Sequence, residues 1–204
     1  MKFDDKIKAL IFDCDGTLVD SWHPHMGAWL SAFKKYNCDL SHEYLNSFLL
    51  ERNGIVAEKI IEELNQRHQT NLNIQSFLMD KEAIAYKALS HIQSIPSIAQ
   101  ILKENSSKYA CIVFSGGNRK NVTKSLEVTD LKQYVHQIIT SDDHYPLKND
   151  PRAYQKIAAL LGLQPEQCHF FEDGEMAIEA AKHAGMQVTA INKETLAKLD
   201  AAFS

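Results

Sequence analysis

The apolar and polar positions at the start of the chain predict a buried strand that ends in acidic residues. Residues 7–12 form a largely apolar run, which Asp13, Asp15 and Gly16 follow. Such a run is typical of a strand buried on both faces of a parallel sheet. The same pattern predicts further strands at residues 109–114, 137–140, 169–172 and 187–191.

Between residues 21 and 91 the pattern changes to helical spacing. Apolar residues recur three and four positions apart, as at Trp29 and Phe33, and four helices are expected, the size of a helical bundle. Elsewhere strands alternate with helices, which implies a parallel sheet covered on both faces. The sequence therefore predicts an α/β, Rossmann-like fold. Its discontinuous core would span residues 1–20 and 92–204, with residues 21–91 forming an inserted helical cap domain, here called the insert.

Composition and charge exclude several classes of protein. The chain has 204 residues, 45% of them hydrophobic and 24% charged, as in ordinary soluble globular proteins. A net charge of −4 argues against a general binder of nucleic acid or anionic membranes. We find no apolar run long enough to span a membrane, no signal peptide and no C-x-x-C pair. We therefore expect a reduced, cytoplasmic protein, a monomer without nucleic-acid or membrane partners.

The carboxylates at the end of the first strand need a counter-charge. Asp13 and Asp15 face the same way in an extended chain, and crowded negative charge is costly unless a cation or a proton relieves it. A calcium loop of EF-hand type is one alternative. A loop starting at Asp13 would need Gly at its sixth position and Glu at its twelfth, where Leu18 and Pro24 stand. The spacing excludes that alternative.

Polar residues also follow two other predicted strands. Ser115 follows the strand at residues 109–114, and Glu172 and Asp173 end the strand at residues 169–172. Because the carboxyl ends of parallel strands lie at one edge of a sheet, these groups should meet there. Lys148 precedes a predicted helix and adds a cation. Singly, each has an ordinary explanation as a turn, a solvated lysine or an acidic helix start; together they indicate a site for a hard metal ion and a phosphate.

The order of these residues resembles the haloacid dehalogenase superfamily. Residues 13–20, DCDGTLVD, resemble its first motif, and Ser115, Lys148 and the pair Glu172-Asp173 stand where its later motifs have their functional residues. The chain looks most like the group of fructose-1-phosphate phosphatases and β-phosphoglucomutases. The stretches that support this group are His25, Ala28 and Trp29, then Asn53-Gly54, and residues 171–173 and 180–186.

The resemblance implies a Mg²⁺-dependent phosphohydrolase of a small phosphate ester, such as a sugar phosphate. Asp13 would attack phosphorus to form an aspartyl phosphate. Asp15 would protonate the leaving oxygen and then activate water. The superfamily's dehalogenases lack the second acid, so Asp15 favours phosphate chemistry.

The remaining roles implied by the resemblance concern the metal ion and the phosphate. Mg²⁺ would bind Asp13, the main-chain carbonyl of Asp15 and Asp173, with Glu172 nearby. Side chains and backbone N–H groups would hold the phosphate oxygens, at Ser115, Gly116 and Lys148.

The insert supplies weaker candidates for substrate binding. His25 lies one helical turn before Trp29 and could contact substrate or link the insert to the catalytic acid, although a lone histidine on a helix is more often structural. Lys81 and Lys87 are expected to be surface charges. A loop that could set specificity, or be only a surface turn, contains Arg52, Asn53 and Gly54.

The chain departs from the superfamily pattern around two motifs. Asn149 and Arg152 stand in a lysine motif that usually reads K-P-x-P-D, and Gly174 replaces the usual Ser or Ala. The catalytic residue types remain, so a phosphatase is expected. Two alternatives stay open: a phosphosugar mutase of β-phosphoglucomutase type, and a catalytically silent binding protein on the same fold.

Overall fold

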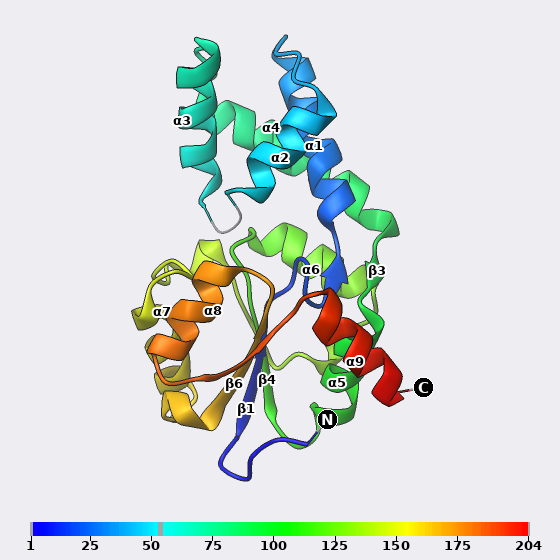
Figure 1. Ribbon diagram of the computed structural model, residues 1–204, viewed down its shortest axis with the longest axis vertical. Helices are drawn as coiled ribbons and strands as arrows, with labels where there is room; N and C mark the ends of the chain where they lie inside the picture. The colour runs from blue at the N-terminus through cyan, green and yellow to red at the C-terminus, as the bar shows by residue number, and fades with distance from the viewer. Residues whose placement is uncertain (1, 53–54, 204) are drawn as a thin grey trace.

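A parallel five-stranded sheet forms the centre of the core (Figure 1). The structure is a computed structural model that describes residues 2–52 and 55–203; Asn53 and Gly54 of the predicted specificity loop lie outside the described residues. The strand order is β5-β4-β1-β6-β7, which confirms the predicted α/β fold. The strands are β1 (Ala9–Phe12), β4 (Ala110–Phe114), β5 (Gln137–Ile139), β6 (Cys168–Glu172) and β7 (Gln187–Ala190).

Helices cover both faces of this sheet, as the buried apolar strands require. Leu10 and Phe12 of β1 pack on one helical layer, whereas Ala9 and Ile11 pack on the other, because alternate residues of a strand face opposite sides. The first layer contains α5 (Pro96–Asn105), α6 (Arg119–Val128) and α9 (Lys193–Phe203), and the second contains α7 (Pro151–Leu160) and α8 (Glu175–His183). Short 3-10 helices lie at Leu89–His91, Lys132–Tyr134, Ser141–Asp143 and Pro165–Gln167.

The insert has its own apolar cluster above the carboxyl end of the sheet (Figure 1). Phe77 contacts Trp29, Phe33 and Tyr36, so aromatic side chains join the first and last helices of the insert. The chain leaves and re-enters the core through a short antiparallel pair, β2 (Val19–Asp20) and β3 (Gln93–Ser94), which the sequence did not predict. The helices of the insert are α1 (Trp22–Lys35), α2 (His42–Leu50), α3 (Ala57–His68) and α4 (Ile74–Ala88).

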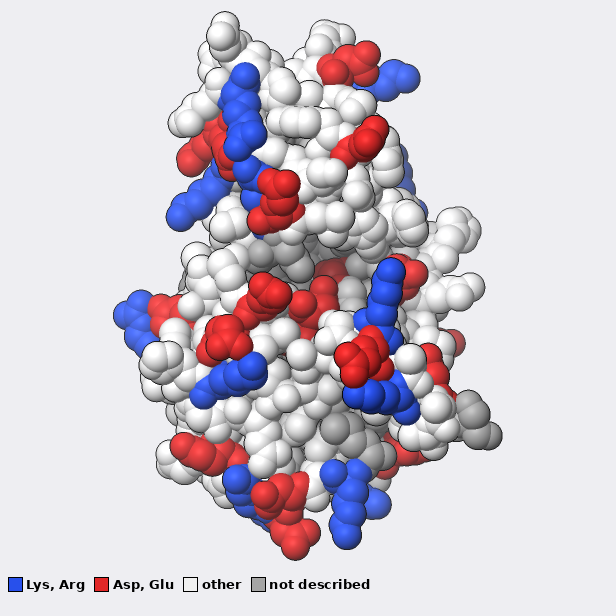
Figure 2. All heavy atoms as spheres, in the orientation of Figure 1, with Lys and Arg blue, Asp and Glu red and all other residues white. Residues whose placement is uncertain are grey.

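The helices in the described part of the chain are too short or too polar to cross a membrane. Their apolar faces instead belong to the three clusters of the core and the insert. Space-filling atoms show a hollow between the insert and the core, with acidic side chains gathered in and beside it (Figure 2).

Candidate active site

The carboxyl ends of β1, β4 and β6 bring distant residues together below the insert. Phe12 of β1 lies in register with Val113 of β4 and Phe171 of β6. The next residues, Asp13 and Glu172, therefore emerge side by side. The edge of the sheet where the sequence predicts the site is thus the edge that faces the hollow.

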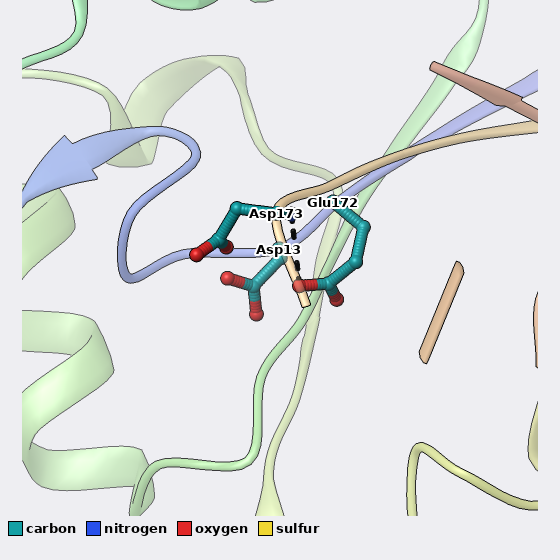
Figure 3. A group of neighbouring side chains, drawn as sticks. All are labelled: Asp13, Glu172 and Asp173. Atoms are coloured by element: carbon teal, nitrogen blue, oxygen red, sulfur yellow. Dashed lines mark hydrogen bonds between the residues drawn. The ribbon is translucent and has the colours of Figure 1, made fainter. Parts of the chain in front are cut away.

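Three carboxylates meet at this edge. Asp13, Glu172 and Asp173 each offer an oxygen, and these oxygens lie within 4.8 Å of one another (Figure 3). Burial, reinforced by Glu172, raises the pKa of Asp13 well above its usual range, and the same causes raise the pKa of Asp173 to about 6. The side chains present therefore leave negative charge uncompensated. Oxygen donors with excess negative charge fit a hard divalent cation such as Mg²⁺.

Lys148 supplies positive charge from the loop before α7. Its Nζ lies 2.6 Å from Asp13 Oδ1 and also pairs with Glu172. Tyr154 donates a hydrogen bond of 2.8 Å to the Lys148 carbonyl and so anchors the loop. Burial disfavours the Lys148 ammonium, but Asp13 and Glu172 outweigh burial and raise its pKa. Lys148 thus remains charged, although Asn149 departs from the usual motif.

Asp15 occupies a different environment from Asp13. Its Oδ1 accepts a hydrogen bond of 2.5 Å from Ser21 and lies 3.3 Å from Nε2 of His25. Burial alone would raise its pKa, but the hydrogen bonds and the charges of His25 and Lys81 outweigh burial and lower it to about 2. The insert therefore contributes directly to the environment of Asp15.

Ser21 was not among the predicted site residues. It stands at the N-cap of α1, where a serine hydroxyl usually accepts a bond from the helix backbone. Here the hydroxyl donates to Asp15 and makes no cap bond. A serine one residue beyond the acidic motif was the signal available in the sequence.

A sharp turn at Gly16 brings the chain close to Asp173. Gly16 has φ +82°, a conformation that L side chains rarely adopt. A Cβ added to Gly16 would lie 2.7 Å from Asp173 Oδ2. Thr17 Oγ1 donates to Asp173 Oδ1 at 3.3 Å. The motif thus needs glycine to let the chain approach a carboxylate of the site.

The loop after β4 also lies close to Asp15. Buried Ser115 accepts a 3.0 Å hydrogen bond from the Gly117 N–H, and a Cβ on Gly117 would lie 3.6 Å from Asp15 Oδ2. Asn118 then caps α6 by accepting from the Asn121 N–H at 2.9 Å. The segment is therefore a capped turn beside the acids, and Gly116 has no atom within 4 Å of where its Cβ would be.

The structure separates the predicted residues of the insert. His25 reaches Asp15, whereas Arg52 lies between Glu63, at 2.7 Å, and the ring of Phe48, at 3.7 Å. The prediction that Lys81 is a surface charge is wrong, because Lys81 is only 7% exposed.

The contacts of Lys81 explain why the sequence pattern missed it. Its Nζ pairs with Glu82 at 2.6 Å and lies 5.2 Å from the Trp29 ring. Helical periodicity identifies the apolar stripe of a helix, but it does not show that a polar position faces a second domain. Lys81 lies at such a position, close enough for its charge to act on Asp15.

The sequence profile of the haloacid dehalogenase-like hydrolases matches residues 10–191. The chain belongs to this family. The predicted family and the prediction that the chain is an enzyme are therefore confirmed. In this chain, buried Asp13 at the carboxyl end of β1 and buried Glu172 at the end of β6 lie beside Lys148.

Several known proteins are similar over nearly the whole chain. Fructose-1-phosphate phosphatase YqaB of Escherichia coli (strain K12) is 26% identical, covering 89% of this chain and 95% of that protein. Beta-phosphoglucomutase of Bacillus subtilis (strain 168) is also 26% identical, covering 88% and 81%. The structure of CbbY from Rhodobacter sphaeroides in complex with phosphate has a TM-score of 0.78 at 22% identity, covering 91% of this chain and 87% of that chain. This last similarity concerns the fold.

Proposed function

We propose that this enzyme is a Mg²⁺-dependent phosphatase of small phosphorylated metabolites, with sugar phosphates as the leading class. The observation that carries the proposal is geometric: Asp13 lies 2.6 Å from Lys148 and close to two other carboxylates, whereas Asp15, two residues on, contacts Ser21 and His25. Asp13 lies beside Lys148 and two other carboxylates, as a nucleophile facing a phosphate would need. Relatives named as sugar-phosphate enzymes support the substrate class.

The two aspartates would act in sequence. Asp13 attacks phosphorus, so a bond forms between its carboxylate oxygen and phosphorus while the bond to the leaving oxygen breaks. Asp15 gives the leaving oxygen a proton and later takes one from the water that hydrolyses the aspartyl phosphate. Because the pKa of Asp15 is about 2, Asp15 must gain a proton before it can act as the acid; Ser21 and His25 are the side chains in contact with its Oδ1.

The remaining residues would neutralise and orient the phosphate. Ser115, the Gly116 N–H and Lys148 would bind its oxygens. Mg²⁺, when bound by Asp13, Asp173 and the Asp15 carbonyl with Glu172 nearby, would offset the charge shared by phosphate and carboxylates.

The insert would act as a cap over the core, residues 21–91 over residues 1–20 and 92–204. Its position above the carboxyl end of the sheet supports this role, because closure there would exclude bulk water during transfer. A small substrate fits beneath such a cap more readily than a phosphorylated protein does. We also propose that the protein is a monomer and that it is cytoplasmic.

Phosphate release tests the proposal. The panel contains p-nitrophenyl phosphate, fructose 1-phosphate and β-glucose 1-phosphate, each with Mg²⁺ and with EDTA, and Asp13→Asn is the matched variant. We expect Mg²⁺-dependent release by the wild type without added bisphosphate, and loss of about 10³-fold or more in the variant. Isomerisation without phosphate release would favour the mutase. Equal inertness of both proteins across the panel would favour the silent binding protein.

A further inference from the structure

Glu82 of α4 joins the insert to the core, because one of its carboxylate oxygens pairs within the insert and the other accepts hydrogen bonds from the core. Oε1 pairs with Lys81 at 2.6 Å. Oε2 accepts hydrogen bonds from Asn118 Nδ2 at 2.8 Å and from Asn121 Nδ2 at 2.5 Å. The two asparagines lie at the start of α6, in the core. We call these four residues the Glu82 clasp.

The core end of the clasp leads to the candidate active site. Asn118 directly follows Gly117, whose Cβ, if present, would lie 3.6 Å from Asp15 Oδ2. On the insert side, Lys81 is only 7% exposed and close enough for its charge to act on Asp15. The clasp therefore joins α4 of the insert to the segment of the core beside Asp15.

The asparagines have donors to spare for this contact. Asn118 already caps α6 through its Oδ1, so its amide N–H groups are not needed within the helix. Asn121 is 5% exposed, and its side-chain amide donates a hydrogen bond to the Glu82 carboxylate. Hydrogen bonds to a charged group are stronger than those between neutral groups, and a buried amide without a partner is costly. When the insert is seated on the core, Glu82 satisfies both amides.

The space beside the clasp shows that packing leaves part of this interface open. A cavity of about 580 Å³ lies between α3, α4 and α6, lined by Glu82 and Asn121 together with Leu78 and Tyr86. Lys120 also lines it, and its Nζ lies 4.4 Å from the Tyr86 ring. Beside this cavity, the contact of α4 with the start of α6 therefore includes polar bonds that water could replace if the insert moved away.

We propose that Glu82 is a positioning residue that fastens the insert to the core. It thereby orients Lys81 through their ion pair and fixes the first turn of α6 after the Ser115 loop. Its effect on turnover rests on the proposed phosphatase function; its effect on the junction does not.

Two substitutions on the same helix separate the clasp from general stability. Glu82→Ala removes the clasp, whereas Asp80→Ala removes contacts to Lys35, at 2.6 Å, and Tyr36, at 2.9 Å, which both belong to the insert. With p-nitrophenyl phosphate and a sugar phosphate, we expect Glu82→Ala to lose about tenfold in kcat on both substrates. Asp80→Ala should stay within about twofold of the wild type, even if its Tm falls.

A donor–acceptor exchange tests whether the bond itself matters. Asn121→Asp sets two carboxylates against each other and should lower kcat at least as much as Glu82→Ala. Glu82→Gln with Asn121→Asp restores one N–H···O bond in the reverse direction. We expect this double variant to recover most of the kcat lost by Asn121→Asp. A double variant no better than Asn121→Asp would overturn the proposal.

Amide hydrogen exchange measures the stability of the contact between α4 and α6 without any substrate. In Glu82→Ala the N–H groups of the first turn of α6 should exchange about tenfold faster, with β4 unchanged, and Glu82→Gln should fall between Glu82→Ala and wild type. Wild-type exchange there in both Glu82 variants would overturn the clasp. If the wild type releases no phosphate from any ester, the phosphatase proposal fails, and the exchange result alone still decides the clasp.

Discussion

Asp13 and Asp15 show how two identical side chains, two positions apart, obtain different chemistry from their surroundings. Asp13 emerges into a buried group of carboxylates, so its pKa rises. Asp15 points toward the insert, where His25 and Ser21 lower its pKa to about 2. For the proposed roles, Asp13 must therefore lose its proton to a cation-rich site, and Asp15 must gain one beside the insert.

Gly16 provides a residue-scale prediction. Gly16→Ala should lower activity by about 10²-fold, because a Cβ 2.7 Å from Asp173 Oδ2 displaces that carboxylate, and small displacements of site groups have effects of this size. The measurement is kcat at saturating Mg²⁺.

Gly162→Ala is the matched control for this substitution. Gly162 has φ +67°, similarly unfavourable for alanine, but no atom lies within 4 Å of its Cβ position. Both variants should lose about 1–2 kcal/mol of stability. Only the Gly16 variant should lose activity; equal activity in the two would show that Asp173 tolerates the displacement.

His169 gives a prediction for pH and stability. Burial lowers its pKa to about 4 and outweighs the opposing effect of the Gln187 side chain. The unfolded chain, with a histidine pKa of about 6.5, binds the proton more readily. The neutral form therefore stabilises the fold fully above about pH 6.5, and that contribution, at most ~3 kcal/mol, is lost as the pH falls toward 4.

Urea midpoints at pH 7.5 and pH 5 measure this contribution. His169→Gln retains a partner for Thr189, which lies 2.8 Å from His169 Nε2, but it does not titrate. We expect the variant to lose less stability than the wild type between the two pH values. An identical loss would assign the pH dependence to other groups.

At the scale of elements, the sequence predicted the buried strands and the polar residues that meet at their carboxyl ends. Continuous apolar runs located the buried strands, and the rule that parallel strands end at one edge brought Asp13, Ser115 and Glu172 together. The pair β2 and β3 was missed because each has only two residues, too few to show a period. Lys81 was missed because its burial comes from another element.

The contact between α1 and α4 gives an element-scale prediction. Phe77 is fully buried, so Phe77→Ala should destabilise the protein by about 3–5 kcal/mol. Met79 on the same helix is 71% exposed, and Met79→Ala should stay within about 0.5 kcal/mol of the wild type. Guanidinium unfolding measures both. A similar loss in the two variants would contradict the packing described for the insert.

At the scale of the whole molecule, the negative charge of the core carboxylates interacts with side chains of the insert. Four carboxylates, Asp13, Asp15, Glu172 and Asp173, approach one another, and Lys148 and the insert offset only part of their charge. The sequence located most of these groups, but it could not show which side chains of the insert would meet them. Which side chains of the insert come close to these carboxylates depends on how the apolar cluster of the insert is placed relative to that of the core.

Metal binding should therefore stabilise the whole molecule. At a Mg²⁺ concentration about 100 times its Kd, binding adds about 2.7 kcal/mol, which raises the Tm by roughly 5–10 °C for a chain of this size. Asp173→Asn should lose most of this shift, whereas Glu175→Gln, at an exposed position two residues away, should keep it. A shift that survives Asp173→Asn would place the ion elsewhere.

Identification of the phosphorylated residue tests the central claim most directly. In Asp15→Asn the first transfer from p-nitrophenyl phosphate needs no acid, because p-nitrophenolate leaves without a proton, but hydrolysis of the aspartyl phosphate lacks its base. The phosphoenzyme should therefore accumulate. Hydroxylamine would convert it to a hydroxamate, which peptide mass spectrometry locates. We predict the modification at Asp13; modification of another residue, or none while p-nitrophenolate is released in a burst, would contradict the account.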